Sequence, residues 1–134
     1  MKFFKFKSKN EPQRYTEIPL DYNIVTASSP FYIKEAYKTL RTNTMFSLSN
    51  EKQKAIIITS SNLGEGKSTV SVNTAITFAQ TGSKIILIDC DLRKPKTHAY
   101  LNLQNKSGLS NYLGGFATLD EVIVPTTYGF DCIT

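Results

Sequence analysis

The sequence contains no tryptophan, one histidine and only two cysteines, Cys90 and Cys132, among its 134 residues. Two such distant cysteines exclude a disulfide framework and a cysteine-based metal cluster, and they are typical of a reducing compartment. No apolar run approaches the ~20 residues that a membrane-spanning helix needs. Lysines interrupt the phenylalanines near the N-terminus, so we expect no signal peptide there. These absences favour a cytoplasmic protein.

Positive charge is concentrated at one end of the chain. The net charge is +5, and residues 1–14 hold five basic side chains against one acid, Glu11. Proteins that bind nucleic acid carry their basic residues on the folded body, so we expect no nucleic acid partner. The interleaved phenylalanines and lysines of residues 2–7 have two interpretations. One is weak attachment to an anionic membrane, at about 1 kcal/mol per basic residue, and the simpler one is a solvated terminus.

Prolines divide the chain into a tail and a folded part. Pro12 and Pro19 interrupt residues 1–29 and Pro30 follows them, and we interpret this segment as a basic tail and linker. The folded part is predicted to cover residues 30–134. It begins with a helix that Ser29 can cap, because apolar side chains then recur at helical spacing. This apolar face consists of Ile33, Ala36, Tyr37, Leu40, Thr44 and Leu48.

Three charged residues form a second stripe on the same helix. Glu35, Lys38 and Arg41 are spaced by three, which places them on one side of it. They form either an intrahelical charge ladder or a contact surface between subunits, and the spacing alone favours the ladder.

The centre of the chain predicts a strand–helix–strand unit. Residues 54–60 are rich in isoleucine, as is typical of a strand buried on both faces. A helix is predicted over 67–81 with Gly82 at its C-terminus, followed by a second buried strand over 85–89. Short helical turns over 109–113 and 119–122 and a third strand over 130–134 come next. The resulting fold class is α/β with a parallel sheet.

A glycine-rich turn between the first strand and its helix carries the strongest chemical signal. It reads Ser-Ser-Asn-Leu-Gly-Glu-Gly-Lys-Ser-Thr over residues 60–69, which meets the pattern G-x-x-x-x-G-K-[ST] except for Ser61 at its first position. Backbone N–H groups of such a turn surround phosphate oxygens. Lys67 can reach the β- and γ-phosphates and Ser68 can bind Mg²⁺. The predicted nucleotide-binding residues are Gly64, Glu65, Gly66, Lys67, Ser68 and Thr69.

Two aspartates follow the second predicted strand. Asp89 and Asp91 are two residues apart, so their side chains point to the same side at the carboxyl end of the strand, where open α/β sheets bind ligands. Two close carboxylates need a cation between them, and Mg²⁺ would supply it. The alternative is an aspartate that caps the next turn, with Arg93 pairing Asp91. Cys90 is predicted to point away from both, into the core.

Together these motifs resemble the bacterial tyrosine kinases of capsular and exopolysaccharide operons. The glycine-rich turn corresponds to the Walker A motif of that family, and residues 86–95 resemble its Walker A′ motif. Residues 35–43 resemble its oligomerisation helix, with Lys38 in place of the middle arginine. The likeness runs from about residue 28 to the end and implies the P-loop NTPase fold.

The resemblance implies ATP and Mg²⁺ as cofactors and a tyrosine as phosphate acceptor. In that scheme Lys67, Asp89 and Asp91 are catalytic, and Ser68 and Asp89 hold Mg²⁺. The contact between subunits would use Glu35, Lys38 and Arg41, and a membrane activator protein of polysaccharide export would be a further partner. The protein would work in the cytoplasm, at the inner face of the membrane.

Two alternatives remain at this point. One is a partitioning-type ATPase switch, but such proteins carry a lysine where this chain has Asn62. The other is an inactive remnant, because the family's Walker B strand and its tyrosine-rich tail are absent from these residues. We therefore expect residues 30–134 to be an incomplete kinase domain that shows no turnover alone.

Overall fold

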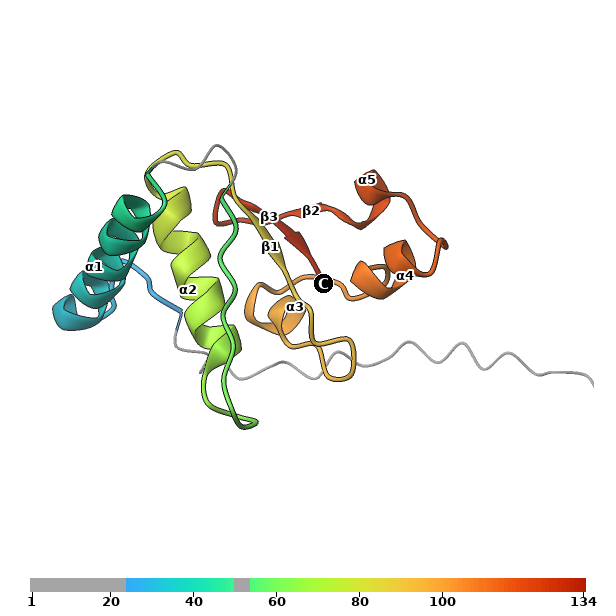
Figure 1. Ribbon diagram of the computed structural model, residues 1–134, viewed down its shortest axis with the longest axis horizontal. Helices are drawn as coiled ribbons and strands as arrows, with labels where there is room; N and C mark the ends of the chain where they lie inside the picture. Colours follow the sequence, from blue (N-terminus) through green and yellow to red (C-terminus); the bar gives the residue numbers. More distant parts are fainter. Residues whose placement is uncertain (1–23, 50–53) are drawn as a thin grey trace, which may run out of the picture.

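The computed structural model describes residues 24–49 and 54–134, and most of the basic tail predicted for residues 1–29 lies outside this part. Helices and small strands follow one another along the chain (Figure 1). No helix among the described residues is both long and apolar enough to cross a membrane. The elements are α1 (Phe31–Ser47), α2 (Lys67–Ala79), β1 (Ile86–Ile88), α3 (Thr97–Tyr100), α4 (Leu109–Leu113), α5 (Leu119–Val122), β2 (Val124–Pro125) and β3 (Asp131–Ile133).

The three strands form one small mixed sheet in the order β1-β3-β2. β1 and β3 are parallel, with Leu87 opposite Cys132, and β2 runs antiparallel to β3. The predicted strand over 85–89 is therefore confirmed as β1, and the one over 130–134 as β3. The predicted parallel pairing is present between β1 and β3, and β2 was not predicted.

Helix α2 lies between α1 and the sheet and forms the centre of the molecule (Figure 1). Its buried side chains Val72, Ala75 and Ile76 pack against Cys132 and Phe130 from the sheet side. On the α1 side, the buried Asn73 accepts a hydrogen bond from the Val25 backbone at 2.7 Å. Because α2 is buried over most of its length, the position of its first turn is fixed by the core.

Helix α1 confirms the predicted helix but not its predicted cap. The Ser29 hydroxyl accepts a hydrogen bond from the Thr26 N–H at 2.9 Å, and no side chain caps the helix. Pro30 occupies the N-cap position, and its fixed φ suits a helix start without a side-chain cap. The predicted apolar face is only partly covered, since α1 has no fully buried residue and Leu40 is 41% exposed.

The predicted strand over 54–60 is wrong for this structure. The segment is drawn without a strand arrow in Figure 1 and belongs to no sheet. Its residue Ile57 is 89% exposed. No backbone hydrogen bond joins it to another described residue. A β-branched sequence favours a strand, but a strand forms only when a neighbour supplies hydrogen bonds. Residues 54–60 make no backbone hydrogen bond to β1, whose paired edge is occupied by β3, so they are not part of the sheet.

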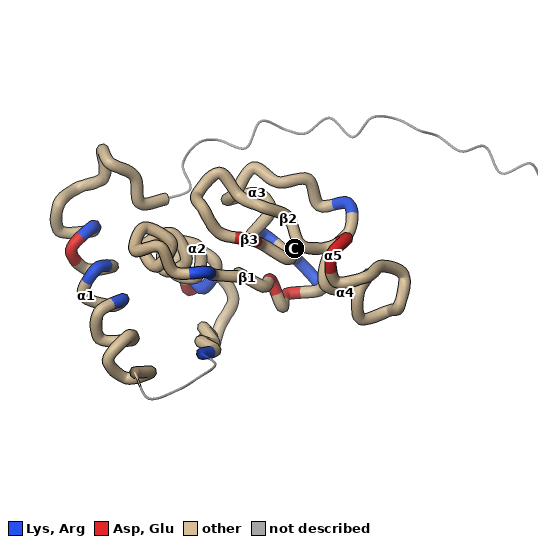
Figure 2. Tube along the Cα trace, turned by 90° about the horizontal axis from the view of Figure 1, so that it is seen from above, with Lys and Arg blue, Asp and Glu red and all other residues tan. Residues whose placement is uncertain are grey.

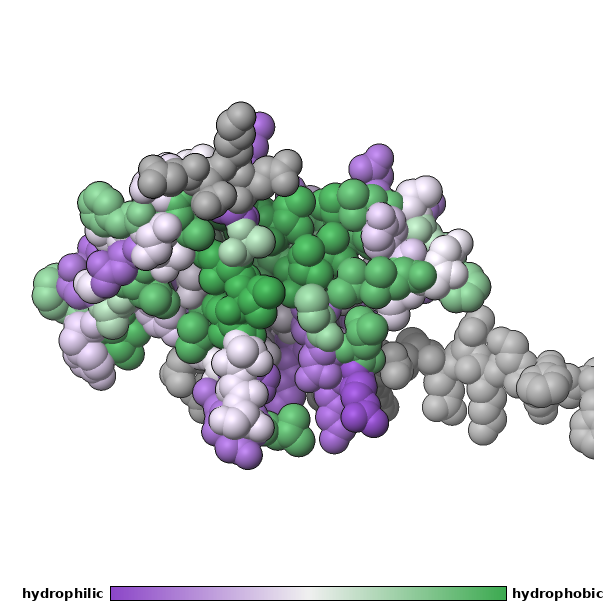
Figure 3. Space-filling view, in the orientation of Figure 1, coloured by the Kyte–Doolittle hydropathy of each residue, from purple (hydrophilic) through white to green (hydrophobic). Residues whose placement is uncertain are grey.

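The other edge of β1 is open. Ile85 and Asp89 bond to β3 through their backbones, and because alternate residues bond to alternate sides, the backbone groups of Ile86 and Ile88 point away from β3. Their side chains are 52% and 46% exposed. Apolar surface gathers over the middle of this face, where Figure 1 draws β1 and residues 54–60 (Figure 3). The structure thus has an uncovered apolar strip with an unpaired strand edge.

The two predicted helical turns near the C-terminus are confirmed as α4 and α5. Gly108 precedes α4 at a point of close backbone contact, where the Leu109 N–H donates to the Thr134 carbonyl at 2.7 Å. A Cβ on Gly108 would lie 1.7 Å from that carbonyl oxygen. Glycine at this position therefore lets α4 contact the end of the sheet.

The open strand edge predicts self-association. Unpaired edges with exposed apolar side chains pair with other chains, so the wild-type chain is expected to sediment as oligomers at micromolar concentration. Ile57→Lys should shift the distribution toward monomer, because a lysine there opposes apolar contact. Leu113→Lys is the matched control, since Leu113 is 64% exposed on α4, outside this edge. A wild-type chain that sediments as a monomer throughout would contradict the prediction.

Candidate functional site

The loop before α2 is built by two glycines in left-handed conformation. Gly64 has φ +79° and Gly66, the N-cap of α2, has φ +88°. A Cβ at either position would meet nothing within 4 Å. The requirement for glycine is therefore conformational and not steric, because other residues adopt this φ only at a cost. The turn redirects the chain so that successive N–H groups face one concave side.

The backbone N–H groups from Gly64 to Thr69 have no acceptor among the described residues. The first N–H of α2 that has an acceptor is that of Val70. It donates to the carbonyl of Gly66, the N-cap residue, at 2.9 Å. Unpaired donors at a helix N-terminus carry partial positive charge. Joined to a glycine turn of this kind, they form a site that accepts the oxygens of an anion such as phosphate.

Lys67 is held at this loop by neutral oxygens. Its ammonium donates to the Ser60 hydroxyl at 2.7 Å and to the Asn62 carbonyl at 3.1 Å. No carboxylate pairs with it among the described ion pairs. The charge of the nearby Glu65 carboxylate acts on it through space, but the direct partners of the ammonium are neutral. The structure thus brings Lys67 to the same loop as the unpaired N–H groups.

Glu65 closes the loop on itself. Its carboxylate accepts hydrogen bonds from the Asn62 backbone N–H at 3.1 Å and from the Asn62 amide at 2.9 Å. The bond from the Asn62 side chain is the main cause that lowers the pKa of Glu65 below its ordinary value. Its side chain therefore shapes the loop, while its backbone N–H belongs to the unpaired set.

Asp89 stands just beyond β1 and binds backbone N–H groups of the following loop. Its carboxylate accepts from Lys96 and Thr97, each at 3.0 Å, and from Asp91 at 3.0 Å. Partial burial raises its pKa, but the hydrogen bonds from Thr97, Asp91 and Lys96 outweigh burial and hold the pKa below its ordinary value. Asp89 is therefore ionised at neutral pH.

Asp91 has a separate set of partners. Its carboxylate accepts from the backbone N–H groups of Arg93 at 3.3 Å and Lys94 at 3.0 Å. Arg93 thus contacts Asp91 through its backbone N–H and not, as the alternative interpretation has it, through its guanidinium group. Each aspartate caps its own turn, which agrees with the alternative interpretation of a turn-capping aspartate. Both aspartates lie in the loop that follows β1, and Figure 2 shows acidic positions near the end of this strand.

The oxygen donors near the loop fit a magnesium ion. The Ser68 hydroxyl has no hydrogen bond to a described residue, and Asp89 offers a partly buried carboxylate. Hydroxyl, carboxylate and phosphate oxygens are the ligands that Mg²⁺ prefers, with water completing the shell. No cluster of three or more His, Cys, Asp or Glu side chains suits a metal in the described ranges, so an ion held only by protein side chains is not indicated.

The two cysteines differ in burial, and only one of them had a predicted place. Cys90 is exposed, so its prediction as a core residue is wrong, because β1 ends at Ile88 and Cys90 lies in the loop that follows. Cys132 is the buried one, in the centre of β3. Burial, with a smaller effect of the Asp89 charge, raises the pKa of the Cys132 thiol to about 12. Cys132 therefore stays protonated and acts as a packing residue.

The charged stripe on α1 is divided between two kinds of contact. Lys38 pairs with Glu35 on the same helix at 2.8 Å. Arg41 donates to the Thr77 carbonyl of α2 at 2.9 Å and so ties α1 to α2. Figure 2 shows acidic and basic positions along the turns of α1. The Glu35–Lys38 pair is half exposed, and Arg41 already has a partner within the chain.

One contact at the site could not be foreseen from the sequence. The Tyr100 hydroxyl lies 2.8 Å from the Thr69 hydroxyl, across 31 positions of sequence. No motif marks Tyr100, because its partner is set only by the packing of α3 on α2. Tyr100 therefore lies near the loop without being predicted to do so.

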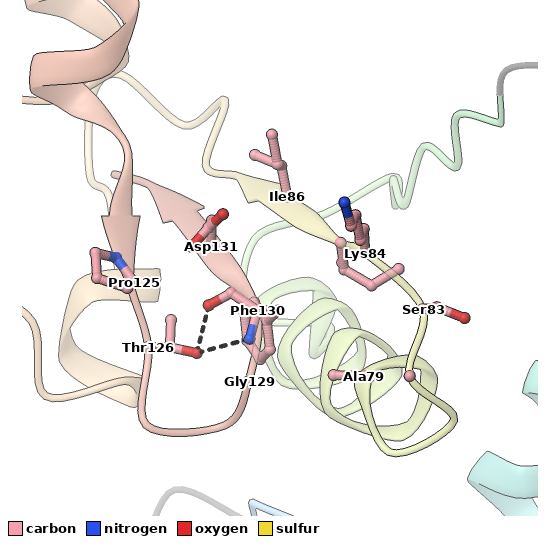
Figure 4. A pocket seen from close by; sticks show the side chains of 11 residues that line it. Ala79, Ser83, Lys84, Ile86, Pro125, Thr126, Gly129, Phe130 and Asp131 are labelled. Atoms are coloured by element: carbon pink, nitrogen blue, oxygen red, sulfur yellow. Dashed lines mark hydrogen bonds between the residues drawn. The ribbon is translucent and has the colours of Figure 1, made fainter.

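A hollow of about 630 Å³ lies at the opposite end of the sheet. It is lined by the end of α2, the start of β1 and the turn between β2 and β3, where Thr126 bonds to the Phe130 backbone (Figure 4). Because α2 and β1 run in opposite directions, this end is the one away from Lys67 and Asp89. The hollow is wide open and holds no convergent set of charged groups, so the loop is the better candidate for a functional site.

Comparison with known proteins finds a P-loop NTPase family and tyrosine-protein kinases. A family model described as "ParA: NUBPL iron-transfer P-loop NTPase" matches residues 51–127. The chain is similar to the tyrosine-protein kinase YwqD of Bacillus subtilis, with 39% identity over 75% of this chain and 43% of the relative. It is also similar to the tyrosine-protein kinase etk of Escherichia coli K12, with 32% identity over 97% of this chain and 17% of that relative.

Solved structures give the same result at the level of the fold. The kinase domain of the Escherichia coli tyrosine kinase ETK matches with a TM-score of 0.73 and 36% identity, over 75% of this chain and 40% of that one. The chimerical protein CapA2B2 matches with a TM-score of 0.72 and 38% identity, over 80% of this chain and 46% of that one. The chain thus spans less than half of the length of these relatives, and the expected P-loop fold class is confirmed.

The lowered pKa of Asp89 predicts a dependence of stability on pH. The folded state binds fewer protons than the unfolded state, so the carboxylate stabilises the fold above the unfolded pKa of about 3.9. This contribution is lost as the pH falls through the lower, folded pKa. The free energy of unfolding, measured with urea, should therefore fall more between about pH 6 and pH 3 for the wild-type protein than for Asp89→Asn. Equal pH dependence of the two proteins would contradict this account of the Asp89 hydrogen bonds.

Proposed function

Since this chain belongs to the ParA family of P-loop NTPases, with bacterial tyrosine kinases among its relatives, we propose that it binds ATP with Mg²⁺ and forms part of a protein-tyrosine kinase. The single observation that carries this proposal is the run of unpaired N–H groups from Gly64 to Thr69 beside Lys67. Such a run of donors needs many anionic oxygens as acceptors. A triphosphate supplies them, and a carboxylate or a single phosphate does not.

The residues of the loop would bind the phosphates through their backbones and through one lysine side chain. The N–H groups of Gly64, Glu65, Gly66, Lys67, Ser68 and Thr69 bind the phosphate oxygens. The Lys67 ammonium leaves the Ser60 hydroxyl, its partner at 2.7 Å, and neutralises charge that develops on the transferred group. Phosphoryl transfer depends mainly on such positioning and charge stabilisation.

The magnesium ion would be held by Ser68 and Asp89 together with phosphate oxygens and water. When bound, it neutralises phosphate charge and orients the terminal phosphoryl group. The Ser68 hydroxyl is available for this, and the Asp89 carboxylate is ionised because its pKa is lowered by the N–H groups of Thr97, Asp91 and Lys96. Oδ2 of Asp89 already accepts two backbone N–H groups and Oδ1 accepts one. Each oxygen offers about two lone pairs, so one lone pair on Oδ1 remains for the ion.

The same carboxylates supply the base for a tyrosine acceptor. Asp89 would accept the phenolic proton as the bond from the phenol oxygen to the γ-phosphorus of ATP forms and the bond from that phosphorus to ADP breaks. Asp91 would add negative charge beside it. A carboxylate of ordinary or lowered pKa is sufficient, because the phenol loses its proton only as it attacks. The acceptor in this proposal is a tyrosine of a neighbouring subunit.

Self-association would use the outer side of α1. Glu35 and Lys38 are half exposed, and Arg41 is held by α2, so Arg41 would orient the helix while the other two meet the neighbour. The proposal also includes a membrane activator protein of polysaccharide export as partner. It places the protein in the cytoplasm, at the inner face of the membrane, where it would regulate the synthesis and export of capsular or exopolysaccharide.

A second candidate is an ATPase switch of the partitioning type, and the family model that matches favours it. Such a switch dimerises on nucleotide and needs a lysine at the position of Asn62. Here the Asn62 N–H and amide are bound by Glu65 and its carbonyl by Lys67, so this position serves the chain's own loop. A tyrosine phosphorylated in the presence of the protein would separate the kinase from the switch and from an inactive, nucleotide-binding remnant.

Removal of the lysine tests the phosphate site. Lys67→Met is expected to weaken the binding of ATP with Mg²⁺ by about 1.5–3 kcal/mol, the range for hydrogen bonds to charged groups, which is a loss of roughly 10- to 150-fold in Kd. Isothermal titration calorimetry measures it. Lys106→Met, at an exposed lysine outside the loop, is the matched control and should bind like wild type. Equal ATP affinity of wild type and Lys67→Met would refute the site.

The aspartates are tested by phosphotransfer in the full-length protein. Asp89→Asn and Asp91→Asn are expected to abolish tyrosine phosphorylation on an antiphosphotyrosine blot, because an amide cannot take up the phenolic proton. Asparagine keeps an oxygen for the backbone N–H groups, so nucleotide binding should change by less than about tenfold. An undiminished blot from both variants would remove the catalytic role.

A further inference from the structure

The hydrogen bond between Thr69 and Tyr100 links the phosphate loop to the loop that holds Asp89. Thr69 lies in the first turn of α2, directly after Lys67 and Ser68, and its hydroxyl is 2.8 Å from that of Tyr100 on α3. Both hydroxyls are partly buried. A partly buried, short hydrogen bond between side chains far apart in sequence is directional and fixes how two elements lie relative to each other.

The position of the Asp89 carboxylate follows the position of α3. One carboxylate oxygen accepts the N–H groups of Lys96 and Thr97, both at 3.0 Å, where α3 begins. Helix α3 has only four residues, so its own hydrogen bonds cannot hold it in place. Any displacement of α3 therefore displaces or releases the carboxylate.

Apolar packing alone does not fix α3. Leu101, which follows the helix, is 4% exposed and belongs to the core around Val72 and Ile76. This contact holds the end of α3 against α2, but apolar contacts are not directional and leave rotation about the contact open. The Tyr100 hydroxyl adds the missing direction, because it is bound to one atom of α2.

We propose that the Thr69–Tyr100 hydrogen bond sets the position of the Asp89 carboxylate relative to the phosphate loop, which makes Tyr100 a positioning residue for the magnesium–nucleotide site. This inference rests on the proposed function for its consequence, but not for its geometry. Its partner Thr69 is the next residue after Ser68, so the bond joins the turn that carries Ser68 to the helix whose first N–H groups hold Asp89. Mg²⁺ requires nearly octahedral geometry at 2.0–2.1 Å, and small displacements of either oxygen therefore weaken its binding.

The geometry is tested without nucleotide, by amide hydrogen exchange of the complete chain. Tyr100→Phe removes one hydroxyl and keeps the ring, and it should accelerate exchange of the Lys96 and Thr97 amides by about threefold to tenfold, the range that one hydrogen bond allows. Thr69→Val should have the same effect, and the double variant should have no larger one. Tyr112→Phe, at a tyrosine 42% exposed on α4, is the control and should leave exchange unchanged. Unchanged exchange in Tyr100→Phe would overturn the proposal.

The consequence for the site is tested by calorimetry with and without magnesium. In Tyr100→Phe, the affinity for ATP without Mg²⁺ should equal that of wild type, while the gain in affinity on adding Mg²⁺ should fall by about threefold to tenfold. An equal loss with and without Mg²⁺ would make Tyr100 a part of the phosphate loop and overturn its positioning role. A wild-type chain that does not bind ATP would refute the proposed function, and the exchange experiment would still decide the role of Tyr100.

Discussion

The burial of α2 between α1 and the sheet is the constraint on which the candidate site depends. Its core residues Val72, Ala75 and Ile76 are almost fully buried against β3 and the residues that follow α3. A helix held over most of its length presents its first turn at one place, and the glycine turn before it must then curve to meet that turn. The free N–H groups of the loop are a consequence, because the core and not a capping side chain fixes where α2 begins.

The loop before α2 is kept in shape by its own polar groups. Asn62 is the central residue, since Glu65 binds its N–H and amide while Lys67 binds its carbonyl. These bonds satisfy the lysine without placing a negative charge on it. The loop therefore keeps a conformation that an anion can enter, and the exchange of neutral acceptors for phosphate oxygens is favourable for the ammonium group.

The aspartates after β1 have a structural role that fits their proposed chemical one. Their carboxylates organise the loop from 89 to 97 by accepting backbone N–H groups, and the same bonds keep Asp89 ionised. A carboxylate that is both held in place and charged is suited to bind a cation and to accept a proton. The structural and the chemical interpretation of these residues are therefore compatible, because a fixed position is what a catalytic carboxylate needs.

The sequence by itself determined the local features of this protein. The glycine–lysine–serine turn, the extent of α1, α4 and α5, and the strands β1 and β3 were predictable, since each depends on propensities and spacings within a few residues. Asp89 and Asp91 were also found, although their backbone partners were not. The tertiary structure alone decided what depends on distant partners. Residues 54–60 form no strand because no described neighbour supplies hydrogen bonds, Cys90 is exposed because β1 ends before it, and Tyr100 reaches Thr69 because α3 packs on α2.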